Sequence, residues 1–436
     1  MSPPAESAAM APEELSARTE PMAPGAGPDP YEVGEAGGVL FDRPDLVLAG
    51  EGVAATIELP SGLESLPDVR AWLAAVPCDD PTPAPGTGVL AFGALPFDRT
   101  EPGRLVVPRR IVGAAPDGRR WCTTVLSPGA GSAPPATSRP RAGATGPAGP
   151  PVLTEDPPGE AYAEAVARAV DALVAGAARK VVLARALDVV LPFPVELAAT
   201  LRRLRTEEPW CTVFCYPAGA GRTGAFFGAS PELLVARRGN TVVSHPVAGT
   251  VALVGDEPGD GAASARLLGS AKDLEEHQLV IDDLVEALRP LCTELDVPAS
   301  PSTVRLHTVA HLATLLTGRL ADGPGGPPDA LGLVAAVHPT PAVGGSPRHE
   351  ALTLLAKLEP VVRGQWAGPV GWMDARGDGD WVLGIRSAFV EGDRAHLLAG
   401  AGIVPGSDPA AELAETTLKF VPVLAALAPG AEHLLG

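Results

Sequence analysis

The feature that most constrains this fold is the order of its apolar segments. Short strand-like runs such as Lys180–Ala186 (KVVLARA) and Thr212–Tyr216 stand beside helical repeats such as Ala161–Ala177, and several strand-like runs follow one another directly. A doubly wound parallel sheet needs regular alternation of strands and helices. The irregular order therefore favours an α+β fold with antiparallel strands.

The elements that we expect fall into two groups. In the N-terminal part we predict a helix near Leu63–Val76 and strands at Gly38–Phe41, Ala54–Leu59, Val89–Phe92, Leu105–Ile111 and Trp121–Val125. Later helices are predicted from Ser270 onward, at His349–Leu358 and at Pro409–Leu427, and later strands at Ala225–Ala229, Leu233–Ala236, Thr241–His245, Ala367–Asp374, Trp381–Glu391 and Arg394–Gly400.

Glycine and proline gather in two stretches that lack periodicity. Residues 1–35 are therefore predicted to be a disordered tail and residues 127–158 a flexible linker. We expect one catalytic domain over residues 36–430, made of a strand-rich part at 36–126 and a core at 159–430.

Charge and cysteine content exclude several classes of protein. The formal net charge of −19 argues against binding to nucleic acid or to an anionic membrane, so an anionic substrate needs a local cationic site. No signal peptide or transmembrane run is recognised, and we expect a cytoplasmic protein. Of the five cysteines, Cys211 and Cys215 lie in an apolar run, which favours buried thiols over a zinc site.

Two acidic pairs stand at the starts of predicted helices. Asp273 and Glu276 share one face of a helix that opens at Ser270, where carboxylates either complement the helix dipole or face a cation. Glu412 and Glu415 repeat this spacing, with Lys419 four residues further on, which alone is typical of an ordinary surface ion pair. Two such pairs on separate helices could jointly hold one Mg²⁺.

The order of motifs resembles that of the chorismate-utilising enzymes, and within them the isochorismate synthases. The resemblance spans about Gly159–Ala426 and rests on KVVLAR (180–185), FGASPELL (227–234), PVAGT (246–250), SAKDLEEHQLV (270–280), HLAT (311–314), HPTPAVGGSP (338–347), GPVGWMD (368–374), IRSA (385–388), AGAGIVP (399–405) and the Glu412–Lys419 segment. Upstream, FGALPFD (92–98) is similar to the siderophore-type members. The resemblance implies the fold of anthranilate synthase component I, two large and mostly antiparallel sheets with helices outside.

The resemblance also implies a reaction, the addition of water to C2 of chorismate with loss of the C4 hydroxyl. The general base of the family falls on Lys180 and the general acid on Glu232. Part of the lysine must then be neutral near pH 7, and Arg185 is a possible contributor to that shift. The glutamic acid must hold its proton.

Further residues receive roles from the same resemblance. Mg²⁺ is expected on Glu276 and Glu415, supported by Asp273 and Glu412. The substrate is expected to contact Gly249, Thr250, His311, Ala342, Trp366, Arg386, Gly400, Gly402 and Lys419. Arg386 is expected to bind the enolpyruvyl carboxylate in a bidentate contact. A core role for His311 remains open.

Single positions favour one member of the family. Enzymes that add ammonia carry Gln at the position of Lys180, and aminodeoxychorismate synthase carries Lys at that of Ala248, so both residues favour water as the nucleophile. Salicylate synthases tend to carry Thr at the position of Ala342, and a pyruvate-lyase activity stays open. Trp366 departs from the usual Tyr or Phe.

A non-catalytic role and an ammonia-dependent reaction are disfavoured by the same residues. A non-catalytic subunit would have lost Lys180, Glu232 or a metal carboxylate, and an anthranilate synthase would need a glutaminase partner and Gln in place of Lys180. We expect a monomer without a glutaminase subunit, serving siderophore, menaquinone or other secondary metabolism.

Overall fold

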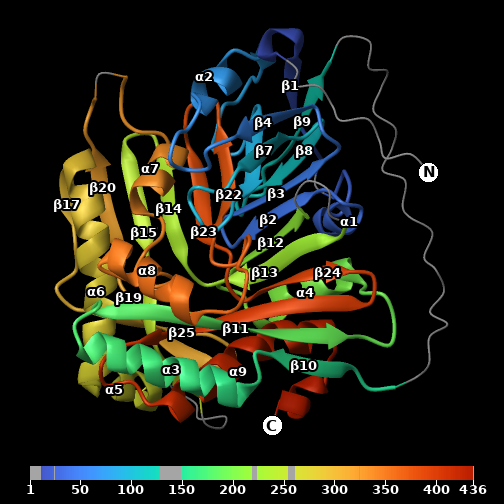
Figure 1. Ribbon diagram of the computed structural model, residues 1–436. Coiled ribbons are helices and arrows are strands. Elements are labelled where there is room, and N and C mark those ends of the chain that lie inside the picture. The colour runs from blue at the N-terminus through green and yellow to red at the C-terminus, as the bar shows by residue number, and fades with distance from the viewer. Residues whose placement is uncertain are drawn as a thin grey trace.

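Two large, almost entirely antiparallel sheets form the body of the protein in the computed structural model (Figure 1). The structure describes residues 11–23, 25–127, 149–218, 223–253, 261–323 and 325–435. Within these residues the larger sheet has thirteen strands, and only β1 and β5 run parallel. Its order is β10 (Val152–Asp156), β11 (Lys180–Val190), β25 (Arg394–Ile403), β24 (Ser387–Glu391), β13 (Ala225–Ser230), β12 (Thr212–Pro217), β2 (Val39–Arg43), β3 (Leu46–Glu51), β8 (Arg110–Ala114), β9 (Arg120–Leu126), β1 (Ser16–Pro21) and β5 (Cys78–Asp79), with β21 (Gly345–Ser346) beside β11.

The other strands of the described residues form a second sheet of nine strands and a small sheet of three. The order in the second sheet is β17 (Cys292–Asp296), β20 (Leu316–Leu320), β15 (Thr241–His245), β14 (Leu233–Arg238), β23 (Gly379–Leu383), β22 (Pro369–Asp374), β6 (Leu90–Ala94), β7 (Gly103–Val107) and β4 (Ala55–Leu59). The small sheet contains β16 (Val247–Ala252), β19 (Val309–Ala313) and β18 (Ser302–Arg305). The α+β class predicted from the sequence is confirmed.

A core rich in aromatic side chains joins the two large sheets. Phe41, Phe214 and Phe226 come from the larger sheet, Phe92 and Trp372 come from the second sheet, and all are buried in one cluster. The rings of Phe214 and Phe226 are 5.4 Å apart between centroids. Aromatic pairs add to the free energy of burial, so this cluster holds the sheets together.

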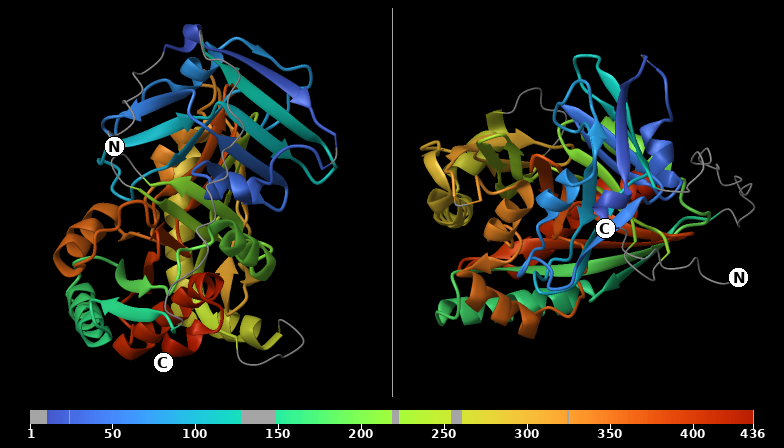
Figure 2. Two further views of the ribbon diagram at one scale, coloured as in Figure 1. Left: turned by 90° about the vertical axis from the view of Figure 1, so that its right-hand side faces the viewer. Right: turned by 90° about the horizontal axis from the view of Figure 1, so that it is seen from above.

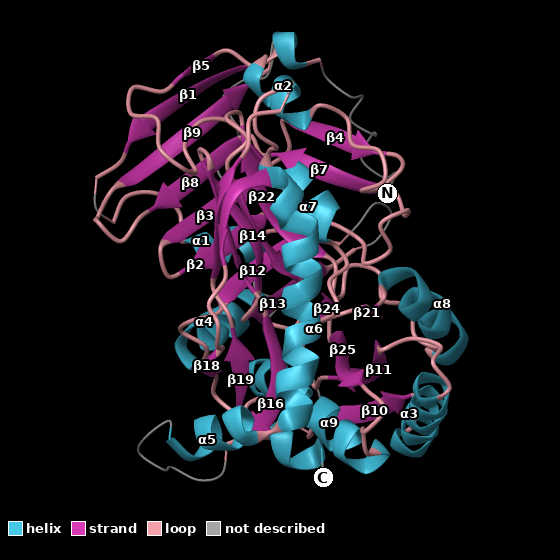
Figure 3. Ribbon diagram, turned by 90° about the vertical axis from the view of Figure 1, so that its left-hand side faces the viewer, coloured by secondary structure: helices cyan, strands magenta, loops and turns pink. Residues whose placement is uncertain are grey.

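Helices cover the outer faces of the sheets (Figures 1 and 2). They are α1 (Pro30–Glu35), α2 (Val69–Ala74), α3 (Gly159–Val174), α4 (Leu197–Glu207), α5 (Gly261–Gly269), α6 (Ala271–Leu288), α7 (Ala330–Val337), α8 (Arg348–Leu358) and α9 (Pro409–Leu427), with 3₁₀ turns at Pro12–Glu14, Arg289–Leu291 and Ala431–Leu435. In Figure 3, the long helix α6 runs from the neighbourhood of α7 down toward α9. Among the described residues, no helix has the length and apolar character needed to cross a bilayer.

Both helices with acidic pairs begin at side-chain caps. The Ser270 hydroxyl accepts a hydrogen bond from the Asp273 amide at the start of α6, and the Asp408 carboxylate accepts one from the Ala411 amide at the start of α9. Such caps satisfy amides that have no partner inside the helix. The two predicted helices therefore form where the sequence places them, and each acidic pair lies near a helix start.

Among the described residues, short turns lead from one large sheet to the other after β3, β7, β13 and β23. The predictions of single strands at Leu105–Ile111 and Trp381–Glu391 are therefore wrong, because each segment contains two strands that belong to different sheets. The helix predicted over Leu63–Val76 is also shorter, at Val69–Ala74.

The prediction of a disordered tail is wrong for residues 11–35 as far as the structure describes them. Strand β1 pairs with β9 over six residues, and its Thr19 hydroxyl shares a buried hydrogen bond of 2.9 Å with Thr123. Helix α1 starts at an Asp29 cap, and the Tyr31 hydroxyl donates to Asp42 at 2.6 Å. Ala17 and Thr19 are buried and alternate with exposed side chains. This alternation holds β1 on the sheet although its sequence is mostly polar.

Part of the predicted linker is also a strand. Residues 152–156 form β10, which pairs with the second half of β11. Glu155 of β10 binds the buried guanidinium of Arg185 at 2.7 Å, and this contact gives a polar strand a fixed place. Residues 128–148 of the predicted linker lie outside the described residues.

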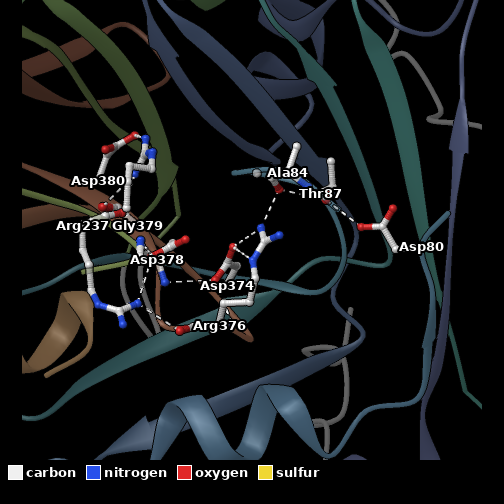
Figure 4. Close-up of polar contacts among 12 residues, drawn as sticks. Asp80, Ala84, Thr87, Arg237, Asp374, Arg376, Asp378, Gly379 and Asp380 are labelled. Carbon is white, nitrogen blue, oxygen red and sulfur yellow. Dashed lines mark hydrogen bonds and ion pairs between the residues drawn. The ribbon is translucent and has the colours of Figure 1, made fainter. Parts of the chain in front are cut away.

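A network of arginine–aspartate contacts fastens the turn between β22 and β23 (Figure 4). Asp374 pairs with Arg376, and the Arg237 guanidinium donates to the Asp378 carboxylate at 2.9 Å. Arg376 also donates to the carbonyl of Ala84 in the loop before β6. The network ties three distant segments together, and each of its buried carboxylates has an arginine partner.

Candidate active site

A pocket lies between the small sheet, strands β11 and β25 of the larger sheet, and the turns that follow β13 and β23. It is lined by Val182, Pro231, Glu232, Val247, Ala248, Gly249, Thr250, Glu276, His311, Ala342, Val343, Trp366, Ile385, Arg386, Leu398, Ala399, Gly400, Gly402, Glu415 and Lys419. All the predicted site residues belong to this lining except Lys180, Asp273 and Glu412. The lining residues come from segments far apart in the sequence, so the fold itself assembles the pocket.

Two of the turns between the sheets place Glu232 and Arg386. Glu232 follows β13, and its carbonyl accepts from the amide of Leu383; Arg386 precedes β24, and its carbonyl accepts from the amide of Ala229. The two crossings thus lie side by side. Arg386 has a φ of 49°, which is unusual for a residue other than glycine and directs this side chain into the pocket lining.

Glu232 is a buried carboxyl group, with 2 % of the residue exposed. Burial raises its pKa to about 8, although Lys180, Lys419 and a backbone hydrogen bond act in the opposite direction. Desolvation disfavours the carboxylate more than these contacts favour it. At neutral pH Glu232 therefore carries a proton.

Lys180 begins β11 and is completely buried behind the pocket wall. Its Nζ lies 2.9 Å from Oε1 of Glu276 on α6. A Cβ on Gly402 would collide with this carboxylate and would lie 2.8 Å from Cε of Lys180. Only glycine at this position lets β25 pass so close to the pair.

Arg185, in contrast, does not adjoin Lys180. Successive side chains of a strand point to opposite faces, so residues 180 and 185 differ in face. The Arg185 guanidinium donates to the hydroxyls of Thr416 and Thr417 on α9. The suggested influence of Arg185 on the lysine is therefore not supported by its position.

His311 is held in one tautomer by two neighbours. Nη2 of Arg386 donates to Nε2 at 3.0 Å, so Nδ1 carries the proton and donates to the carbonyl of Gly249 at 3.0 Å. Burial, Arg386 and Lys419 lower the pKa of His311 to about 3, which keeps the ring neutral. The histidine is thus both a satisfied buried side chain and a part of the pocket lining, beside Thr250.

Arg386 retains hydrogen-bonding capacity. Its Nε is buried without a hydrogen-bond partner within the described part of the chain. Burial also lowers the pKa of the guanidinium from its usual value, though an arginine stays charged. A cation with a free donor in a pocket is suited to an anionic ligand.

The carboxylates of α6 and α9 each face a lysine or another acid. Lys419 lies 2.6 Å from Glu415, and Lys272 of α6 lies 2.6 Å from Glu412 of α9. Burial alone would raise the pKa of Glu415, but Lys419 outweighs burial and lowers it. Burial and the neighbouring Glu276 hold the pKa of Asp273 above its usual value. Lys272 was missed in the sequence, where it reads as an ordinary helix lysine.

This donor set fits a hard divalent cation in chemistry. Glu276 and Glu415 line the same pocket from two helices, and Mg²⁺ prefers carboxylate oxygens together with water or substrate oxygens. Among the described residues, no three acidic, histidine or cysteine side chains converge into a ready-made metal site. The protein thus offers two carboxylates, with Asp273 and Glu412 behind them.

Glycines make the close approaches of the pocket possible. Gly249 has a φ of 69° at a bulge in β16, and a Cβ there would lie 3.0 Å from Cβ of Asp273. A Cβ on Gly400 would lie 3.0 Å from the indole of Trp366. Trp366 is buried, and its Nε1 is without a hydrogen-bond partner within the described ranges. Ala342 completes this side of the lining.

Comparison with known proteins identifies the family of this chain. The model of the chorismate binding enzyme family matches residues 140–428. The chain is 43 % identical over 372 residues to a candidate isochorismate synthase of Mycobacterium tuberculosis, MenF, covering 83 % of this chain and 90 % of that protein. The structure superposes on MenF of Escherichia coli, a menaquinone-specific isochorismate synthase, with a TM-score of 0.79 and 25 % identity over 95 % of this chain and 94 % of the other.

The predicted fold is confirmed by a more distant structure. Anthranilate synthase component I of Streptococcus pneumoniae superposes with a TM-score of 0.66 and 21 % identity over 89 % of this chain and 92 % of that one. At this identity the likeness concerns the fold alone. With the family match and the close relative, it follows that the chain belongs to the chorismate binding enzymes, among the isochorismate synthases.

Proposed function

We propose that this chain converts chorismate to isochorismate by adding water at C2 and expelling the C4 hydroxyl. The observation that carries the proposal is a buried carboxyl group, Glu232, whose raised pKa keeps it protonated beside the buried Lys180 and the cationic Arg386. Such a group can give a proton to a departing hydroxyl at neutral pH. The similarity to isochorismate synthases supports the same reaction.

The atoms of the reaction balance within this site. The neutral amine of Lys180 accepts a proton from water as the water oxygen bonds to C2. The two conjugated ring double bonds both shift, from C1=C2 and C5=C6 to C1=C6 and C4=C5, as the C4–O bond breaks. Glu232 gives its proton to the departing hydroxyl, which leaves as water. One water enters and one leaves, so the product is an isomer of the substrate. Buried Nζ of Lys180 has no hydrogen-bond partner beyond its ionic contact within the described residues, which supports a role toward water.

Substrate carboxylates are proposed to bind at opposite ends of the pocket. Arg386 binds the enolpyruvyl carboxylate, since its guanidinium retains a buried free donor among the described residues. Gly400 and Gly402 allow backbone groups to approach a carboxylate. Lys419 adds positive charge, and the neutral His311 lies near the ring. Gly249 and Thr250 line the side of the ring carboxylate.

Magnesium is proposed as the cofactor, held directly by Glu276 and Glu415 and supported by Asp273 and Glu412. When bound, the ion neutralises the ring carboxylate of chorismate and fixes its orientation. The placement of Glu276 and Glu415 on one pocket supports this assignment.

The decisive experiment is an assay of the purified full chain with chorismate and Mg²⁺, without ammonia. Isochorismate as the product supports the proposal. Salicylate with stoichiometric pyruvate would instead establish a salicylate synthase, and anthranilate formed in a parallel assay with added ammonia would establish an ammonia-dependent enzyme. Because the proposed form is a monomer without a glutaminase subunit, the same preparation should elute at the mass of one chain.

A further inference from the structure

The edge of β11 that faces away from β25 is interrupted. Strand β21 pairs with Lys180 and Val181, and β10 pairs from Ala186 onward. Within the described residues, no strand pairs with this edge at residues 182–185. This stretch is buried, and buried backbone groups need hydrogen-bond partners.

Two side chains take the place of the missing strand. Oε2 of Glu359 accepts from the amide of Ala184 at 2.7 Å, and Nη2 of Arg363 donates to the carbonyl of Val182 at 2.7 Å. The two side chains also bind each other, from Nε to Oε1 at 2.6 Å and from Nη2 to Oε2 at 2.7 Å. Their exposed fractions are 1 % for Glu359 and 4 % for Arg363. This bidentate pair forms a rigid unit in the gap.

Arg363 also holds two further parts of the pocket. Its Nη1 donates to the carbonyl of Val343 at 2.7 Å. Its guanidinium carbon lies 5.0 Å from the ring of Trp366 and 4.2 Å from the ring of Phe97. Val182, Val343 and Trp366 all line the pocket. One guanidinium therefore joins three walls of the site to a residue of the N-terminal part.

We propose that Arg363 and Glu359 are positioning residues of the reaction. They fix the start of β11, with Lys180, relative to the walls that Val343 and Trp366 provide. Neither side chain lines the pocket, so their effect is exerted through these neighbours. Apolar residues often replace a buried ion pair without loss of stability, which argues that this pair contributes geometry rather than stability alone. The inference rests on the proposed function.

Kinetics of Arg363→Lys and Glu359→Gln test this role. Lysine lacks the planar fork, so it cannot hold Glu359, Val182 and Val343 together. We expect each variant to be folded at the assay temperature. Its kcat should be lower by on the order of 10- to 100-fold, with a smaller change in KM, as for a displaced catalytic group. The measurements are isochorismate formation and thermal unfolding by circular dichroism. If Arg363→Lys does not fold, Glu359→Gln decides, because it preserves the side-chain volume.

The matched control is Arg237→Lys in the network of Figure 4. Arg237 is equally buried and pairs with Asp378 at 2.9 Å, but neither residue lines the pocket. This variant should have a lower Tm than the wild type but the same kcat and KM. The inference is overturned if Arg363→Lys and Glu359→Gln behave like this control. A wild-type chain that makes no isochorismate would instead overturn the proposed function itself.

Discussion

Glu232 and Lys180, the two proposed catalytic residues, are both buried but have different neighbours. The pKa of the carboxyl group is raised to about 8, because burial outweighs the two nearby lysines. Lys180 is equally buried but keeps a carboxylate, Glu276, within 2.9 Å. The amine of Lys180 thus has a carboxylate neighbour on α6, whereas Glu232 avoids the cost of a buried charge by holding its proton.

The first prediction concerns pH. Protonated Glu232 is the active form, and its pKa is about 8, so kcat/KM should be lost as the pH rises through that value. Glu232→Gln removes the proton donor and should lower kcat by about 10²- to 10⁴-fold, with little change in chorismate affinity. Steady-state kinetics on both sides of this pKa measure the two effects. Wild-type kcat in Glu232→Gln would exclude this acid.

The second prediction concerns the base. Lys180→Gln should abolish isochorismate formation while chorismate still binds, because Arg386 and Lys419 are untouched. Calorimetric titration with chorismate and product analysis measure the two properties separately. Lys357→Gln on the exposed side of α8 is the control and should behave as the wild type. Turnover in Lys180→Gln would remove this residue as the base.

At single positions, the family motifs predicted more of the site than the spacing of residues alone could. The twelve lining residues predicted from motifs meet at one pocket, although their roles remain proposals. The placement of Arg185 near Lys180 failed, although the two-residue period of a strand predicts opposite faces. Glu359 and Arg363 were not predicted, because an acid and an arginine four residues apart read as a surface pair.

At the scale of elements, the facing starts of α6 and α9 define the proposed metal site. The contact between Lys272 and Glu412 joins these two helix starts. Both helices could be predicted because a capping residue precedes an apolar period. Helix α7 could not, because its sequence ALGLVAAV is apolar on every side and shows no period.

The third prediction is that Mg²⁺ binding depends on these carboxylates. Glu276→Gln or Glu415→Gln should abolish measurable binding, and Asp273→Asn should weaken it about 10- to 100-fold, as expected for a supporting group. Isothermal titration with Mg²⁺ in the presence of chorismate measures the affinity independently of turnover. Glu275→Gln changes an exposed neighbour on α6 and should bind as the wild type. Unchanged affinity in Glu276→Gln would place the ion elsewhere.

The fourth prediction concerns the bulge in β16. Gly249 and Gly239 both have positive φ, at 69° and 57°, but only Gly249 has a close neighbour, the side chain of Asp273. Gly239→Ala should therefore lose about 1 kcal/mol of unfolding free energy. Gly249→Ala should lose more and should also raise the KM for chorismate. Denaturant unfolding and kinetics measure both. Equal losses in the two variants would show that the close approach does not matter.

At the scale of the whole molecule, the pocket depends on chain segments that leave one sheet for the other. Period and turn residues predicted most strands but not the sheet to which each belongs, because a strand pattern is the same in either sheet. The run Leu105–Ile111 shows this, since Pro108 and Arg109 separate β7 of the second sheet from β8 of the larger one. Only long-range pairing decides such an assignment.

The last prediction concerns the N-terminal strand β1, which was not predicted from the sequence because its segment contains few apolar residues. It pairs with β9, and Leu15 just before it is buried in the main core cluster. Deletion of residues 1–22 should reduce the free energy of unfolding by about 2 kcal/mol or more, the transfer free energy of one buried leucine.

In the larger sheet β1 lies at the end opposite to β11 and β25, so below its Tm the shortened chain should keep the kcat and KM of the full chain. Deletion of residues 1–10 leaves every contact of β1 that the structure describes in place and is the control. Denaturant unfolding followed by circular dichroism measures the difference between the two deletions. If both deletions unfold at the same denaturant concentration, β1 contributes nothing to stability. If the longer deletion changes KM, the edge strand acts on the pocket through the sheet.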